Sequence, residues 1–261
     1  MMYDIGLKLW STNVGAYREE AVRLFNEGVF DYLELFVVPD SLGTLADWKS
    51  LKMPFVIHNA HSAQGFNLAD ADCRERNHEI YLQTKAFADA LNAEHIIFHG
   101  GVDGSIEETV RQLKSFDESR ALLENKPCVP LPNDFGVKSC RGATEEEIGF
   151  VIAETGCGFC LDVGHAVCAA AAQGVEPYGY LKRLTRFRPA MFHLSDVADM
   201  SAIYDSHPHL GTGRLDIRRV VAEVFPPSAK ISVETEKLDS DRLDDFKEDV
   251  RYLRRVAGEL S

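Results

Sequence analysis

The sequence has little of what marks membrane, secreted or disulfide-rich proteins. No apolar run in its 261 residues approaches the roughly 20 needed to cross a bilayer, and its first residues lack the basic and apolar regions of a signal peptide. The six cysteines are scattered along the chain, unlike the dense cysteines of a disulfide framework. We therefore expect a cytoplasmic protein with no membrane partner.

Positive charge is also scarce. The chain has 28 Lys and Arg against 41 Asp and Glu, a formal net charge of −13. Proteins that wrap nucleic acid normally present a basic surface, because neutralising phosphates supplies much of their affinity. The charge therefore disfavours nucleic acid as a partner, although a local basic patch remains compatible with it, and favours a small-molecule substrate.

Short apolar runs alternate with segments of helical periodicity. Nearly continuous apolar runs are typical of parallel strands that are buried on both faces. Such runs occupy residues 5–10, 32–38, 54–58, 95–99, 121–124, 158–162, 190–193 and 231–234. Helical spacing occurs at residues 17–27, 70–91, 106–116, 144–155, 176–186, 216–225 and 238–257. Eight βα units predict one α/β domain over residues 1–261, a (β/α)8 TIM barrel.

Some helix starts carry capping signals. Thr144 with Glu147 three residues later forms a capping box, and Asp216 and Asp239 each precede an apolar periodic run. We expect helices to begin at these positions.

The last six apolar runs share a further property, because each ends on a residue that can bind a metal. These residues are His58, His99, Glu124, Asp162, His193 and Glu234. The carboxyl ends of barrel strands meet at one mouth, and three more candidates follow nearby strand ends: His165, Asp205 and His207. Any one of them alone could be an ordinary hydrogen-bonded residue. Six successive strands ending this way are hard to obtain by chance, because such residues are expensive to bury unpaired.

Imidazole and carboxylate ligands suit zinc, manganese or iron. One metal needs three or four protein ligands, so nine candidates indicate more than one metal. Two long segments overhang the expected mouth, residues 125–142 with three prolines and residues 194–215, and such loops usually shape substrate pockets, with a structural or oligomer contact as the alternative.

Several phrases resemble endonuclease IV within the xylose isomerase-like group, a (β/α)8 family also called AP endonuclease family 2. They are Leu-Glu124-Asn, Leu-Asp162-Val-Gly-His165, His193-Leu-Ser-Asp, and Asp205-Ser-His207 followed by Gly-x-Gly. The resemblance covers the third to the eighth strand and is weak before about residue 55. It implies a trinuclear centre whose nine ligand positions are all filled.

By this resemblance, His58, His99 and Glu124 would hold one metal. Glu124 as a bridge, with Asp162, His193 and Glu234, would hold a second. His165, Asp205 and His207 would hold a third. We expect two or three Zn²⁺, with Mn²⁺ or Fe²⁺ as alternatives.

The sequence departs from the DNA-cleaving members in its loops. Those members carry basic and aromatic residues after strands two and three, whereas here residues 38–43 and 58–68 are polar or acidic. Gly-Thr-Gly at 211–213 also replaces the family's usual Gly-Glu-Gly. These departures put duplex DNA in doubt as the substrate.

Two functions fit these residues. The first is a hydrolase of a small phosphorylated substrate, because clustered metals lower the pKa of a bound water and stabilise both oxygens of an in-line displacement. The second is a sugar or sugar-phosphate isomerase or epimerase, which would use one metal on Glu124, Asp162, His193 and Glu234 and move a proton next to a carbonyl. In either reading Glu124 and Glu234 are the catalytic carboxylates.

Two other classes stay open, a multinuclear iron oxidase and a binding protein without activity. For substrate contacts the candidates are Lys8 and Trp10 at the end of the first strand, and His61 and His209 in mouth loops. Packing is an equally good explanation for Lys8 and Trp10.

Overall fold

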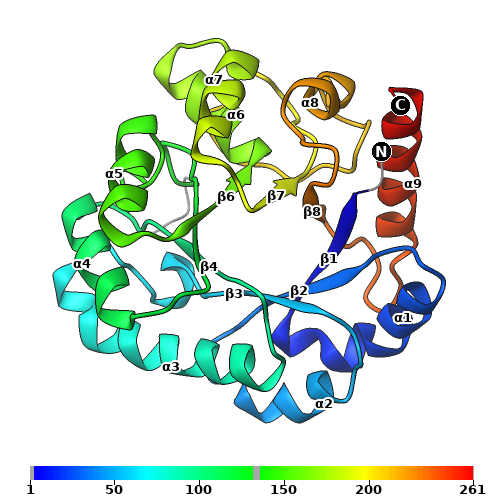
Figure 1. Ribbon diagram of the computed structural model, residues 1–261, viewed down its shortest axis with the longest axis horizontal. Coiled ribbons are helices and arrows are strands. Elements are labelled where there is room, and N and C mark those ends of the chain that lie inside the picture. Colours follow the sequence, from blue (N-terminus) through cyan, green and yellow to red (C-terminus); the bar gives the residue numbers. More distant parts are fainter. Residues whose placement is uncertain (1–2, 132–135, 261) are drawn as a thin grey trace.

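The computed structural model describes residues 3–131 and 136–260. Eight parallel strands close in chain order into a barrel, and Figure 1 shows the helices as an outer ring around it. The prediction of a (β/α)8 TIM barrel is therefore confirmed. No helix within the described ranges is long and apolar enough to cross a membrane.

The strands are β1 Asp4–Trp10, β2 Tyr32–Phe36, β3 Phe55–His58, β4 Ile96–His99, β5 Ala121–Glu124, β6 Gly158–Asp162, β7 Met191–Leu194 and β8 Lys230–Val233. The α-helices are α1 Val14–Asn26, α2 Leu45–Lys49, α3 Arg74–Ala90, α4 Ile106–Phe116, α5 Glu145–Thr155, α6 Val163–Gln173, α7 Pro177–Leu184, α8 Ile217–Glu223 and α9 Asp244–Glu259. Short 3₁₀ turns occupy η1 Ser11–Asn13, η2 Leu42–Thr44, η3 Ser62–Gln64, η4 Ala71–Cys73 and η5 Thr185–Phe187.

Two of the three predicted helix starts are confirmed. The Thr144 hydroxyl accepts the N–H of Glu147 at 3.2 Å, and the Asp216 carboxylate accepts the N–H of Arg219 at 3.0 Å. The start at Asp239 is wrong, because α9 begins at Asp244 and has no side-chain cap. The sequence between these two aspartates is polar and largely exposed, so it has no apolar face to pack as a helix.

Helices α2 and α6 were not predicted. Helix α6 follows Asp162 directly, and Val163 to Ala170 are all buried. A helix that is apolar all round has no amphipathic period to detect. Helix α2 has only five residues, too few for a clear period.

The barrel interior is built in two layers. The lower layer is apolar and consists of Tyr32, Val56, Ile97, Leu122, Cys160 and Met191. Side chains two positions apart in a strand point to the same face. The next inward positions are Glu34, His58, His99, Glu124, Asp162 and His193. The same step leads from Gly6 to Lys8 in β1 and from Ser232 to Glu234 at the end of β8. Every strand thus delivers one ionisable side chain to the layer nearest the mouth.

Gly6 shows how the lower layer is closed. A Cβ at this position would lie 2.4 Å from the ring of Tyr32, so only glycine leaves room for that ring. The Tyr32 hydroxyl in turn lies 2.9 Å from the hydroxyl of Ser232 on β8. The aromatic ring therefore fills the barrel beneath the ionisable layer and carries a hydrogen bond across it.

Candidate metal centre at the barrel mouth

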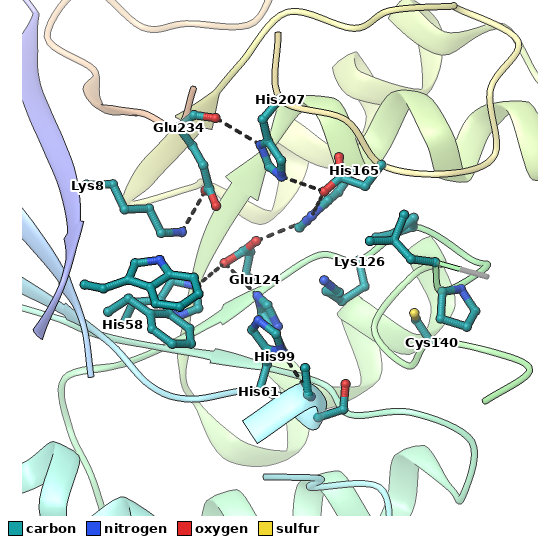
Figure 2. Close-up of a pocket in the computed structure, with 18 of the residues that line it drawn as sticks. Lys8, His58, His61, His99, Glu124, Lys126, Cys140, His165, His207 and Glu234 are labelled. Atoms are coloured by element: carbon teal, nitrogen blue, oxygen red, sulfur yellow. Dashed lines mark hydrogen bonds and ion pairs between the residues drawn. The ribbon is translucent and has the colours of Figure 1, made fainter. Parts of the chain in front are cut away.

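Glu124 lies at the centre of the ionisable layer, as Figure 2 shows. Its Oε2 is 2.9 Å from Nε2 of His58 and 3.1 Å from Nε2 of His99. The ring of His58 is oriented by its other nitrogen, since Nδ1 lies 2.7 Å from the backbone oxygen of Asn59. The structure thus brings together His58, His99 and Glu124, as the sequence predicted.

A second group shares the same carboxylate. Nδ1 of His193 is 3.5 Å from Oε2 of Glu124, 3.7 Å from Oδ2 of Asp162 and 2.9 Å from Oε2 of Glu234. His193 and Asp162 are paired neighbours in β7 and β6, which fixes their side chains next to each other. The four residues predicted for this group are therefore adjacent, and Glu124 belongs to both groups.

The third group lies above Glu124. Nε2 of His165 and Nε2 of His207 are 3.1 Å and 2.8 Å from Oδ2 of Asp205. The Asp162 carboxylate accepts the backbone N–H of His165 at 2.6 Å, so the residue that starts α6 also places this histidine. Nδ1 of His207 is 2.9 Å from the backbone oxygen of Glu234, which leaves Nε2 facing Asp205.

These groups have the donor chemistry of a divalent-metal centre. In His58–His99–Glu124 and in His165–Asp205–His207, one ligand atom from each residue lies within 4.8 Å of the others. Nε2 of His99 and Nδ1 of His193 are buried without a hydrogen-bond partner among the described residues, although each lies at ion-pair distance from a carboxylate. Buried lone pairs that converge without directed donors fit a cation.

The charges in the third group are strongly shifted. Burial opposes the charged form of His207, but the Asp205 carboxylate outweighs it and raises the pKa of His207 to about 9. Burial alone would likewise lower the pKa of His165, yet Asp162 and Asp205 hold it well above its usual value. Burial favours the neutral form of Asp205, but the two histidines that face its carboxylate outweigh burial and lower its pKa. Both histidines of this group are thus held toward the imidazolium form beside one carboxylate.

Metal binding to the third group should release protons. A metal requires neutral imidazole, so each bound ion must displace the protons of His165 and His207. The apparent affinity should therefore fall as the pH drops below about 9, on the order of tenfold per pH unit for each proton released. Calorimetry of Zn²⁺ binding in buffers of different ionisation enthalpy measures the proton count. His207→Ala should lower that count by about one, and an affinity that does not change with pH would contradict the assignment.

A cavity of about 490 Å³ opens above the centre. Its lining includes three lysines, Lys8, Lys126 and Lys237, and the aromatic residues Trp10 and Phe36. The side chain of Trp10 is 49% exposed, with its ring 5.3 Å from that of Phe36.

Three of the four predicted substrate contacts, Lys8, Trp10 and His61, line this cavity. The ring of His61 stacks on that of His99 at 5.4 Å. His209 is placed elsewhere, with its Nδ1 2.8 Å from Oδ2 of Asp249 on α9, and it is not among the described residues that line the cavity. The structure thus places His209 against α9, and its contact with substrate stays a prediction.

The two long loops after the strands contribute to this site. Residues 126, 127 and 129–131 of the first loop line the cavity, and the second loop supplies Asp205 and His207. Residues 132–135 of the predicted first loop lie outside the described residues.

Sequence reasoning missed Glu34. It lies in the middle of β2, fully buried, with Oε2 2.9 Å from Nε2 of His193 and Oε1 3.2 Å from the Lys8 ammonium. Lys8 also lies 2.7 Å from Oε2 of Glu234. A lone carboxylate within the apolar run Tyr-Leu-Glu-Leu-Phe was the available signal, but it stands in the middle of the run and not at its end.

Comparison with known proteins gives consistent matches. The family described as xylose isomerase-like TIM barrel matches residues 30–256. A probable endonuclease 4 of Mycobacterium bovis (strain BCG / Pasteur 1173P2) is 29% identical over 240 residues, covering 85% of this chain and 91% of the relative.

Two solved structures share the fold. Endonuclease IV from Thermus thermophilus superposes with a TM-score of 0.69 at 22% identity, covering 98% of this chain and 99% of the other. A D-tagatose 3-epimerase-like protein superposes with a TM-score of 0.68 at 17% identity, covering 99% of this chain and 100% of the other. The same barrel is thus found in proteins named as an endonuclease and as epimerase-like.

Proposed function

The chain belongs to the xylose isomerase-like TIM barrel family, and we propose that it is a divalent-metal enzyme that hydrolyses a phosphoester of a small phosphorylated molecule. The observation that supports this most is the position of Glu124, whose carboxylate faces His58 and His99 through Oε2, His193 through the same oxygen, and His165 at 3.1 Å through Oε1. A one-metal enzyme does not need all these groups around one carboxylate. Bound together, two or three divalent ions, with zinc favoured by the ligands, would activate water and stabilise the oxygens of an in-line displacement.

The proposed roles follow from the contacts. Glu124 would be shared by the first two metal groups, and Glu234 would serve the second group from the rim of the mouth. The Lys8 ammonium is held 2.7 Å from Glu234, and the carboxylates of Glu234, Glu34 and Glu124 raise its pKa even though burial alone would lower it. It therefore stays charged at the wall of the cavity, where it balances the carboxylates of Glu34 and Glu234.

The cavity supports a small substrate. Its volume of about 490 Å³ lies within the range of roughly 300–1,000 Å³ that is usual for small-molecule sites. Lys126 and Lys237 add positive charge inside a chain whose net charge is −13. These lysines could contact the phosphate of a small phosphorylated metabolite, beside the acidic residues that also line the cavity, Glu124, Asp205, Glu234 and Glu236. Cytoplasmic localisation is part of this proposal.

A sugar or sugar-phosphate isomerase or epimerase is the second candidate. Trp10 offers an exposed ring, packed on Phe36, on which the apolar face of a sugar could stack. Glu124, Asp162, His193 and Glu234 alone would hold the one metal that this chemistry needs, with the two glutamates on hand to move a proton.

Counting metals and testing both reactions on one preparation separates these candidates. We expect elemental mass spectrometry of protein purified without chelator to find two or three zinc or manganese ions per chain, with hydrolysis of small phosphate mono- and diesters lost on chelation. The isomerase would be favoured by one ion per chain together with incorporation of solvent deuterium, in D₂O, at the carbon next to the carbonyl of a ketose sugar. Cleavage of abasic-site DNA at a rate above that of small esters would replace the small substrate with nucleic acid.

A further inference from the structure

Glu34 is the one ionisable residue of the mouth layer that neither the predicted ligand set nor the predicted substrate contacts include. It lies on β2, across the barrel from β7, and its side chain is fully buried. Its Oε2 lies 2.9 Å from Nε2 of His193, whose opposite nitrogen faces the second metal group. A carboxylate is thus bonded to the far side of a candidate metal ligand.

The hydrogen-bond directions around Glu34 are determined by its charge. Its Oε1 lies 3.2 Å from the Lys8 ammonium in a buried ion pair, so Glu34 is present as the carboxylate. The ionised carboxylate can only accept, so the hydroxyl of Ser232 donates to Oε2, and Nε2 of His193 must carry a proton toward the same oxygen. The Tyr32 hydroxyl, in the apolar layer beneath, lies 2.9 Å from the Ser232 hydroxyl. Because Ser232 donates its proton to Glu34, Tyr32 is the donor in this second hydrogen bond.

Glu34 could itself be read as a ligand, because it lies close to His58 and His193 in a group that could hold a metal. Its contacts argue otherwise. Oε2 already accepts from Ser232 and His193, and Oε1 lies 3.2 Å from the Lys8 ammonium. Oε1 of Glu34 and Nδ1 of His193 both lack a directed hydrogen bond from the described residues, but their surroundings differ. Oε1 faces only the Lys8 ammonium, whereas Nδ1 lies within 3.7 Å of the carboxylates of Glu124, Asp162 and Glu234.

We propose that Glu34 is a positioning residue for His193: it keeps a proton on Nε2, fixes the ring, and so presents the Nδ1 lone pair to the second metal group. Lys8 balances the charge of Glu34 and joins it to Glu234, another member of that group. Carboxylates that bond the far nitrogen of a metal-bound histidine fix its tautomer and orientation, and their loss typically costs 10–100-fold in metal affinity. The inference rests on the metal-centre part of the proposed function and not on the choice of substrate.

Glu34→Ala tests the proposal by two measurements. The first is the affinity of each metal in competition with a chromogenic chelator, and we expect one ion to bind about 10–100-fold more weakly while the others stay within about threefold. The second is NMR of the ¹⁵N-labelled His193 ring in metal-free protein. We expect its Nε2 proton to be hydrogen-bonded and slow to exchange in the wild type and to lose this protection in the variant. Glu34→Gln keeps an acceptor oxygen near Nε2 of His193, so it should retain part of the metal affinity and part of the protection of the Nε2 proton.

Asp249→Asn provides a matched control. Asp249 is also a buried carboxylate, 2.8 Å from a histidine nitrogen, but its partner His209 belongs to none of the three groups. It should change stability without changing metal affinity. Unchanged affinities in Glu34→Ala with a lower melting temperature would show a purely structural role and overturn the proposal.

The NMR measurement needs no metal, so the two hypotheses fail separately. If the wild type binds no metal but its Nε2 proton depends on Glu34, the metal centre is wrong and the positioning of His193 stands. An Nε2 proton that is equally protected in Glu34→Ala would overturn the positioning role whatever the metal content.

Discussion

Glu124→Gln is expected to lose two metals per chain together and to lower phosphoester hydrolysis by at least about 10³-fold, since bound metals contribute several kcal/mol to transition-state stabilisation. The reason is geometric. One oxygen of Glu124 faces His58, His99 and His193, so the first and second groups share it. A neutral amide presents one weaker acceptor oxygen and a nitrogen that repels cations, and cannot join two of them.

Metal content by elemental mass spectrometry and initial rates on the same sample provide the measurement. Glu108→Gln is a suitable control, because Glu108 is a buried carboxylate of α4 that pairs with Arg74 at 2.5 Å, outside the three groups. It should keep the wild-type metal content. Loss of only one metal in Glu124→Gln would count against the shared carboxylate.

His165→Ala is expected to remove a single metal and leave the barrel folded. Its Nε2 lies 3.1 Å from Oδ2 of Asp205, in the group that is separate from His58 and His193. After the substitution a metal in this group would keep only Asp205 and His207, which are too few ligands for tight binding. The first two groups would keep all of their ligands. If the third ion takes part in the reaction, hydrolysis should fall by on the order of 10²-fold or more.

Far-ultraviolet circular dichroism and thermal unfolding with chelator will show whether the variant remains folded. The variant leaves a small cavity near the start of α6, so a modest loss of stability, about 1–3 kcal/mol, is expected without loss of fold. Wild-type metal content in folded His165→Ala would instead make His165 a substrate contact.

Helix boundaries show where local sequence information is enough. The range 106–116 was predicted residue for residue, because α4 has a clear apolar face and Ser105 caps it by accepting the N–H of Glu108 at 3.2 Å. Helix α6 was missed because its sides are all covered, by the barrel and by its neighbour α7. A helix covered on all sides is apolar all round, so its sequence lacks the periodicity by which helices are recognised.

The sequence by itself determined the barrel and the mouth at which the candidate ligands gather. Strand runs that end on His, Asp or Glu need no tertiary knowledge, because parallel strands with helical crossovers bring their carboxyl ends to one mouth. The family resemblance, which the comparison confirms, was visible in the same short phrases.

Only the tertiary structure decided which of these residues touch. Strand periodicity says that Glu34 points inward, but not that it meets His193 five strands further along the chain. That contact depends on the closure of the barrel and the stagger between its strands, as does the sharing of Glu124 between the first two groups. His209 illustrates the opposite case, since a loop conformation turned it toward Asp249. Local sequence fixes the face on which a side chain lies, whereas contacts across a closed barrel depend on all eight strands at once.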